Sequence, residues 1–204
     1  TEDAQLMVGA GREEAVTSTI AFKLRSRLPW LVVNLFTSAV AAMVVLQFEG
    51  LIAELAVLAV LMPLVANQAG NAGQQSLAVT LRGLVLDEVP HRGGFALLLR
   101  EGGVGLVNGV CCGVLVGGAI AAIELLSGGG SAWRLGVVVA IAMSVALAVG
   151  CLAGAGIPIL MRRAGADPAT ASTIFLTMVT DSLSFLSFLG LASALSGWIE
   201  VPPA

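Results

Sequence analysis

The sequence predicts an all-α integral membrane protein, and three observations carry this prediction. Hydrophobic residues make up 57% of the 204 residues and charged residues only 11%, whereas a soluble domain carries about 25% charged residues. The mean hydropathy is +0.97. The apolar residues also gather in five long runs, each close to or above the ~20 residues with which a helix crosses a bilayer.

Five transmembrane helices are therefore expected, over residues 29–47, 52–84, 95–126, 133–160 and 169–198. In the segment before them, Val16, Ile20, Leu24 and Leu28 recur at every fourth position between charged residues. This spacing predicts an amphipathic helix on the inner membrane surface, with a solvated connector as the alternative. The chain thus divides into a cytoplasmic connecting helix, residues 1–28, and a five-helix transmembrane pore domain, residues 29–204.

Basic residues predict the orientation of these helices. Nine of the ten fall on one side of the expected membrane, and only Arg134 falls on the other; the nine are Arg12, Lys23, Arg25, Arg27, Arg82, Arg92, Arg100, Arg162 and Arg163. Because Lys and Arg are enriched in cytoplasmic loops, the N-terminus is expected in the cytoplasm and the C-terminus outside. The expected location is the inner (plasma) membrane.

Polar side chains interrupt the second run within ten consecutive residues: Asn67, Gln68, Asn71, Gln74, Gln75 and Ser76. On a helix, Asn67, Asn71 and Gln74 share one stripe, with Gly70 beside it. Lipid offers these amides no hydrogen bonds, so they must face protein or water. Neutral oxygens beside glycines suit an ion pathway, while an amide-mediated helix interface is the alternative.

The fifth run contains a single ionisable residue, Asp181, within the 22 residues from 174 to 195. A carboxylate there lies near the middle of a ~30 Å hydrocarbon core, which is costly and typical of a functional site. Thr177 and Thr173 precede it at four-residue intervals, and Ser184 lies close to the same face. These side chains predict a polar stripe that leads to the carboxylate.

Two polar stripes in one helical bundle predict a pathway for a hard cation. Mg²⁺ prefers oxygen ligands, keeps several waters and is typically held by one or two carboxylates. One aspartate per chain supplies little charge, and a symmetric homodimer would supply two.

Three other function classes compete with a cation pathway. A proton- or Na⁺-coupled secondary transporter of divalent cations is the main alternative, although internal repeats are not found. A scaffold whose polar residues only hold helices together is another. An aspartyl protease needs two juxtaposed aspartates, so no enzymatic activity is expected.

Glycines and cysteines in the apolar runs are expected to serve packing. Gly105, Gly109, Gly113 and Gly117 fall at four-residue spacing in the third run and predict a smooth ridge against another helix. The three cysteines, Cys111, Cys112 and Cys151, sit in apolar runs without metal-ligand spacing and are expected to be buried thiols.

Three blocks of the sequence resemble the MgtE family of magnesium channels. They are "EDAQLMVGAGREEA" with the "RLPWLVVNLFTSAVAAMVVLQFE" that follows, "MPLVANQAGNAGQQSLAVTLRGL", and "GADPATASTIFLTMVTDSLSF". The resemblance implies a homodimer of five-helix subunits in membrane lipid that conducts Mg²⁺, and other divalent cations, into the cell. It also implies a pore lined by the second and fifth helices.

Carried over by position, the resemblance gives six metal-site candidates: Gly70, Asn71, Gln74, Thr173, Thr177 and Asp181. Mg²⁺ is then the transported ion, and no nucleic-acid partner is expected. Because the chain opens at "TEDAQ", the cytosolic regulatory domains of the family are expected upstream of it.

Overall fold

The computed structural model describes residues 2–11, 13–89, 94–126, 133–169 and 172–199. Within these ranges all regular structure is helical, which confirms the all-α class. The helices are α1 (Glu2–Met7), α2 (Ile20–Leu46), α3 (Glu49–Glu54), α4 (Val57–Val85), α5 (Gly94–Leu126), α6 (Trp133–Arg163), α7 (Ser172–Ala194) and α8 (Ser196–Ile199). Arg12 and Arg92, two of the nine basic residues that predict the orientation, lie outside the described residues.

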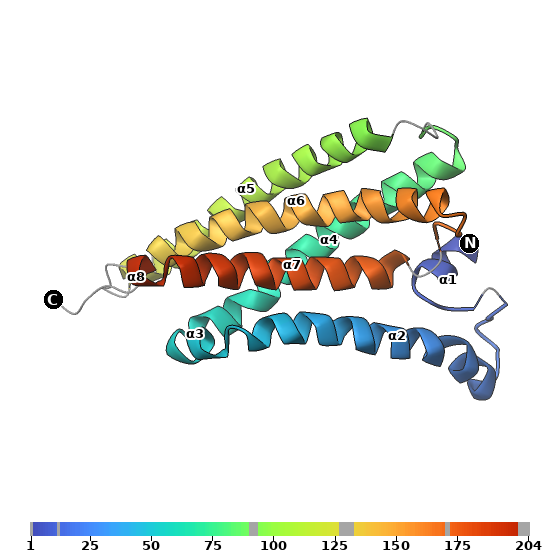
Figure 1. Ribbon diagram of the computed structural model, residues 1–204, viewed down its shortest axis with the longest axis horizontal. Helices are drawn as coiled ribbons and strands as arrows, with labels where there is room; N and C mark the ends of the chain where they lie inside the picture. Colours follow the sequence, from blue (N-terminus) through green and yellow to red (C-terminus); the bar gives the residue numbers. More distant parts are fainter. Residues whose placement is uncertain (1, 12, 90–93, 127–132, 170–171, 200–204) are drawn as a thin grey trace.

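In the described part of the chain the five long helices α2, α4, α5, α6 and α7 form a bundle, with α6 and α7 between α5 and α2 (Figure 1). Helix α6 packs against α4, α5 and α7, and α7 also packs against α4 and α2. Helices α2 and α5 lie at opposite edges of the bundle (Figure 1). The core between α4, α6 and α7 contains fully buried side chains such as Leu58, Val138, Met143 and Phe188.

In the described part of the chain, four helices are long and apolar enough to cross a membrane: α2, α5, α6 and α7. Helix α4 has 29 residues and therefore the length to do so. It is not among the four because its run of amides lowers its hydropathy. Five spans thus remain a prediction, which depends on how the polar face of α4 is covered.

Helix α2 does not break at the expected boundary between residues 28 and 29. It starts after Thr19, whose hydroxyl accepts a hydrogen bond from the amide of Phe22 at 3.4 Å, and it passes through Pro29 to Leu46. A proline in a helix removes one backbone donor, and here it does not end the helix. The expected surface helix and the expected first span are therefore one continuous helix from Ile20 onward.

The glycine ridge of α5 packs against α6, as the sequence predicts. A Cβ atom added at Gly109 would lie 2.5 Å from Ser144 Cα, and one added at Gly117 would lie 2.5 Å from the Gly136 carbonyl oxygen. Only hydrogen fits at such a distance, so the two backbones approach more closely than any other residue would allow.

The cysteines only partly follow the prediction of buried thiols. Cys151 is buried, and its sulfur donates to the Ala72 carbonyl oxygen of α4 at 3.6 Å. Its own carbonyl oxygen accepts a hydrogen bond of 2.9 Å from Ser76 Oγ, which ties α4 to α6 a second time. Cys111, however, is exposed and Cys112 half-buried, because they lie beside the glycine ridge rather than on it.

The two ends of the bundle differ in charge. Basic side chains gather where α2 and α7 begin and where α4 and α6 end: Lys23, Arg25, Arg27, Arg82, Arg162 and Arg163. At the opposite end, Arg134 lies 5.8 Å from the ring centroids of Trp133 and Trp198 and donates to the Trp198 carbonyl oxygen at 2.8 Å. This asymmetry agrees with the basic end facing the cytoplasm, which remains a prediction.

Candidate functional site

The amides of α4 lie on the face that points away from the bundle. Asn67, Asn71, Gln74 and Gln75 are all exposed, whereas Ala69, Ala72 and Gly73 between them are buried against the other helices. The helical period produces this division, because residues three and four apart share a face. In the single chain, the predicted stripe is therefore a row of exposed amide side chains along α4.

The stripe on α7 is half-buried. Thr173, Thr177 and Asp181 are each partly covered, and the Thr177 hydroxyl donates to the Thr173 carbonyl oxygen at 2.8 Å. Asp181 has no hydrogen bond or ion pair with the described residues. Ser184 is buried and faces the core rather than the stripe, so the fourth expected member does not extend it.

Helices α4 and α7 meet close to Asp181. A Cβ atom at Gly70 would lie 3.9 Å from Thr180 Oγ1, and one at Gly73 would lie 3.0 Å from Leu176 Cδ1. Gly70 is next to Thr180, and Gly73, further along α4, is next to Leu176, which comes earlier in α7. The two helices therefore run antiparallel where they cross. Gly70 is thereby brought beside the residue that precedes Asp181, which brings the two stripes to one level of the bundle.

Thr173 and Thr177 face α2, whereas the sequence predicts that they line a path with α4. Thr173 and Thr177 line a cleft of about 510 Å³ together with Arg27, Trp30 and Asn34 of α2. The remaining lining residues are Val8, Gly9, Ala10, Leu31 and Ile174. The six candidates therefore divide: Gly70 and Asp181 lie near the α4–α7 crossing, Asn71 and Gln74 on the outer face of α4, and the two threonines beside α2.

Among the described residues, no group of three or more His, Cys, Asp or Glu side chains could hold a metal ion. Asp181 is the only carboxylate of its helix. One copy of the chain thus offers a single carboxylate on α7, with hydroxyl groups on the same helix and amide groups on α4. Such a set is incomplete for a dehydrated dication but suits one that keeps its waters.

The sequence pattern does not single out Asn34. It is the only amide side chain in the 27 residues of α2, and it lines the cleft opposite Thr173 and Thr177. The signal that could have found it is the one that found Asp181, a polar residue inside a long apolar run. Its effect on the sequence pattern is weak because a single amide carries no charge and changes the mean hydropathy of the long run only slightly.

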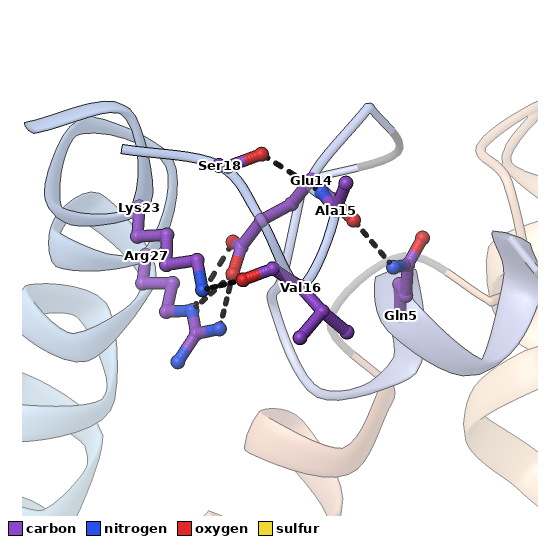
Figure 2. A network of polar contacts seen from close by, with 7 residues as sticks. All are labelled: Gln5, Glu14, Ala15, Val16, Ser18, Lys23 and Arg27. Carbon is purple, nitrogen blue, oxygen red and sulfur yellow. Dashed lines mark hydrogen bonds and ion pairs between the residues drawn. The ribbon is translucent and has the colours of Figure 1, made fainter. Parts of the chain in front are cut away.

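The segment before α2 contributes Val8, Gly9 and Ala10 to the wall of this cleft. Its Glu14 carboxylate pairs with the Arg27 guanidinium, whose Nε donates at 2.9 Å, and Lys23 Nζ donates to the Val16 carbonyl oxygen at 2.8 Å (Figure 2). The hydrogen bond from Arg27 holds the pKa of Glu14 below its ordinary value. These contacts attach the segment to the start of α2.

Comparison with known proteins identifies relatives of this chain. The MgtE family model, described as a divalent cation transporter, matches residues 62–191. The chain is 33% identical to the magnesium transporter MgtE of Bacillus subtilis over 95% of its own length and 42% of that protein. It is 38% identical to the Enterococcus faecalis protein of the same name, over 82% of this chain and 36% of that one.

A third relative, the magnesium transporter MgtE of Thermus thermophilus, is 29% identical over 83% of this chain and 36% of that protein. The chain therefore spans well under half the length of the curated relatives that it matches. The family match covers α4 except its first five residues and α7 except its last three, and these two helices carry the candidate residues.

Proposed function

The chain belongs to the MgtE family, whose model describes a divalent cation transporter, and we propose that it conducts Mg²⁺ across a membrane. The family is one of transporters rather than of enzymes. The proposed path runs between α4 and α7 and leads from outside the cell to the cytoplasm at the basic end of the bundle. Mg²⁺ is the substrate, and other divalent cations of similar chemistry compete for the path.

One observation carries the proposal: α4, which bears a row of exposed amides, meets α7 where Gly70 lies beside Thr180, the residue before the only carboxylate of α7. Moving an unpaired amide from water into an apolar medium costs several kcal/mol. Four exposed amides in a row on a lipid-facing surface are therefore untenable. A second copy of the chain and the water between the copies would cover them.

The second copy also completes the charge of the site. Asp181 from each of two copies gives the two carboxylates with which Mg²⁺ is typically held, while the ion keeps several waters. In this arrangement Asn71, Gln74 and the backbone of Gly70 face the hydrated ion with neutral oxygens. Thr173 and Thr177 continue the polar stripe from Asp181 toward the basic end.

Uptake of Mg²⁺ into liposomes, followed with an indicator trapped inside, tests this function. We expect uptake that follows the Mg²⁺ gradient and the membrane potential and that needs no gradient of H⁺ or Na⁺. Uptake only in the presence of an imposed H⁺ or Na⁺ gradient would favour a coupled transporter of divalent cations. Native mass measurement of the same sample should give two copies, and a monomer that transports would remove the two-carboxylate site.

A further inference from the structure

We infer that the cleft between α2 and α7 is a water-filled vestibule of the proposed path and that Asn34 is a positioning residue for the hydrated cation. This inference rests on the proposed function, because it assigns the approach to the site of Asp181. It adds α2 to the two helices expected to line the path.

The size of the cleft is the first support. Its volume is about 510 Å³, and a water molecule occupies ~30 Å³ in the liquid. The cleft therefore has room for more than ten water molecules, enough for an octahedral Mg²⁺ that keeps its hydration shell. Thr173 and Thr177 form its α7 wall, and Asp181 follows Thr177 by one helical turn, about 6 Å along the axis.

The state of the Asn34 side chain is the second support. Its amide has no hydrogen-bond partner among the described residues, although it lines the cleft from the middle of an apolar helix. An amide left unpaired in lipid is costly, whereas water in the cleft satisfies it. Asn34 also offers a carbonyl oxygen opposite the threonine hydroxyls, which are the kind of neutral partners that the outer shell of a hydrated dication accepts.

A positive charge in the wall of the cleft would repel a cation, and the one cationic side chain among the lining residues, Arg27, is neutralised by an ion pair. Arg27 lines the cleft, but its Nε and Nη2 atoms donate to the Glu14 carboxylate (Figure 2). The pair brings no net charge to the cleft. The remaining polar groups of the lining, from Trp30, Asn34 and the two threonines, are neutral.

Thiol accessibility tests whether the cleft contains water. In a background with the three native cysteines replaced by alanine, Asn34→Cys should react with a membrane-impermeant thiol reagent in liposomes. Leu35→Cys is the matched control, because Leu35 is the next residue, is 69% exposed and does not line the cleft. We expect at least a tenfold faster reaction at position 34, and equal rates at both positions would overturn the inference.

Transport tests the positioning role. Asn34→Leu should lower Mg²⁺ uptake at low external Mg²⁺ by roughly fivefold, the effect of one lost neutral hydrogen bond. Asn34→Ser, which restores a polar group, should recover most of it, and Leu35→Ala should leave it unchanged. Normal uptake by Asn34→Leu would overturn the inference; if Asp181→Asn abolished uptake in the same assay, the proposed function would still stand.

Discussion

Replacement of single glycines in α5 tests how closely this helix packs against α6. A Cβ atom at Gly109 would lie 2.5 Å from Ser144 Cα, where 3.4 Å or more is ordinary contact, so the two backbones must part by about 1 Å. Overpacking of this kind costs about 1–3 kcal/mol, and the gain in helix propensity from glycine to alanine offsets at most about 1 kcal/mol of it. Gly109→Ala should therefore destabilise the bundle.

Gly103 of the same helix provides the matched control. A Cβ atom there meets nothing within 4 Å, so Gly103→Ala keeps only the favourable propensity term. For a chain of this size, 1 kcal/mol corresponds to roughly 2–4 °C in Tm. Thermal unfolding in detergent should show a lower Tm for Gly109→Ala and an unchanged or higher one for Gly103→Ala. Shifts of the same sign and size in both variants would refute the close α5–α6 contact.

Three further predictions concern α4 and the segment before α2. Ser76→Ala should lower the free energy of unfolding by about 1 kcal/mol or less, since it removes the hydrogen bond to the Cys151 carbonyl oxygen; no change in thermal unfolding would contradict that bond. Asn71→Leu should lower Mg²⁺ uptake while stability is retained, because Asn71 is outside the core, and unaltered uptake would remove it from the path. Because Arg27 lowers the pKa of Glu14, the Glu14–Arg27 attachment is complete above pH 4.5, the ordinary value, and is lost as the pH falls through the lowered pKa. The protection of residues 13–18 against hydrogen exchange, taken relative to the intrinsic rate at each pH, should fall only in acid, and in Glu14→Gln it should already be low at neutral pH; unchanged protection in that variant would contradict the attachment.

Much of the fold could be predicted because it follows from local properties of the sequence. Apolar run lengths give the long helices, and four-residue glycine spacing gives the α5–α6 contact. The continuity of α2 could not be predicted, because a proline after charged residues also suits the boundary between two helices. Whether such a helix breaks depends on the α7 surface that it packs against, which lies far away in the sequence.

The candidate site could be predicted only as residues on helices. Periodicity puts Asn71 and Gln74 on one face of α4 and the threonines on one face of α7, and the structure agrees on both. Periodicity does not predict which neighbouring helix each of these faces contacts. The orientation of Thr173 and Thr177 toward α2, and hence the part given to Asn34, depends on the rotation of α7 within the bundle, which tertiary packing decides.

Mg²⁺ uptake by the Asp181→Asn variant tests the central claim most directly. The substitution keeps the size and hydrogen-bonding capacity of the side chain and removes the charge that attracts a hydrated dication. At low external Mg²⁺ in liposomes, we expect uptake to fall at least tenfold relative to the unaltered chain, while thermal unfolding without Mg²⁺ changes little, because Asp181 has no partner among the described residues. Uptake equal to that of the unaltered chain under these conditions would contradict the claim that Asp181 binds the transported ion.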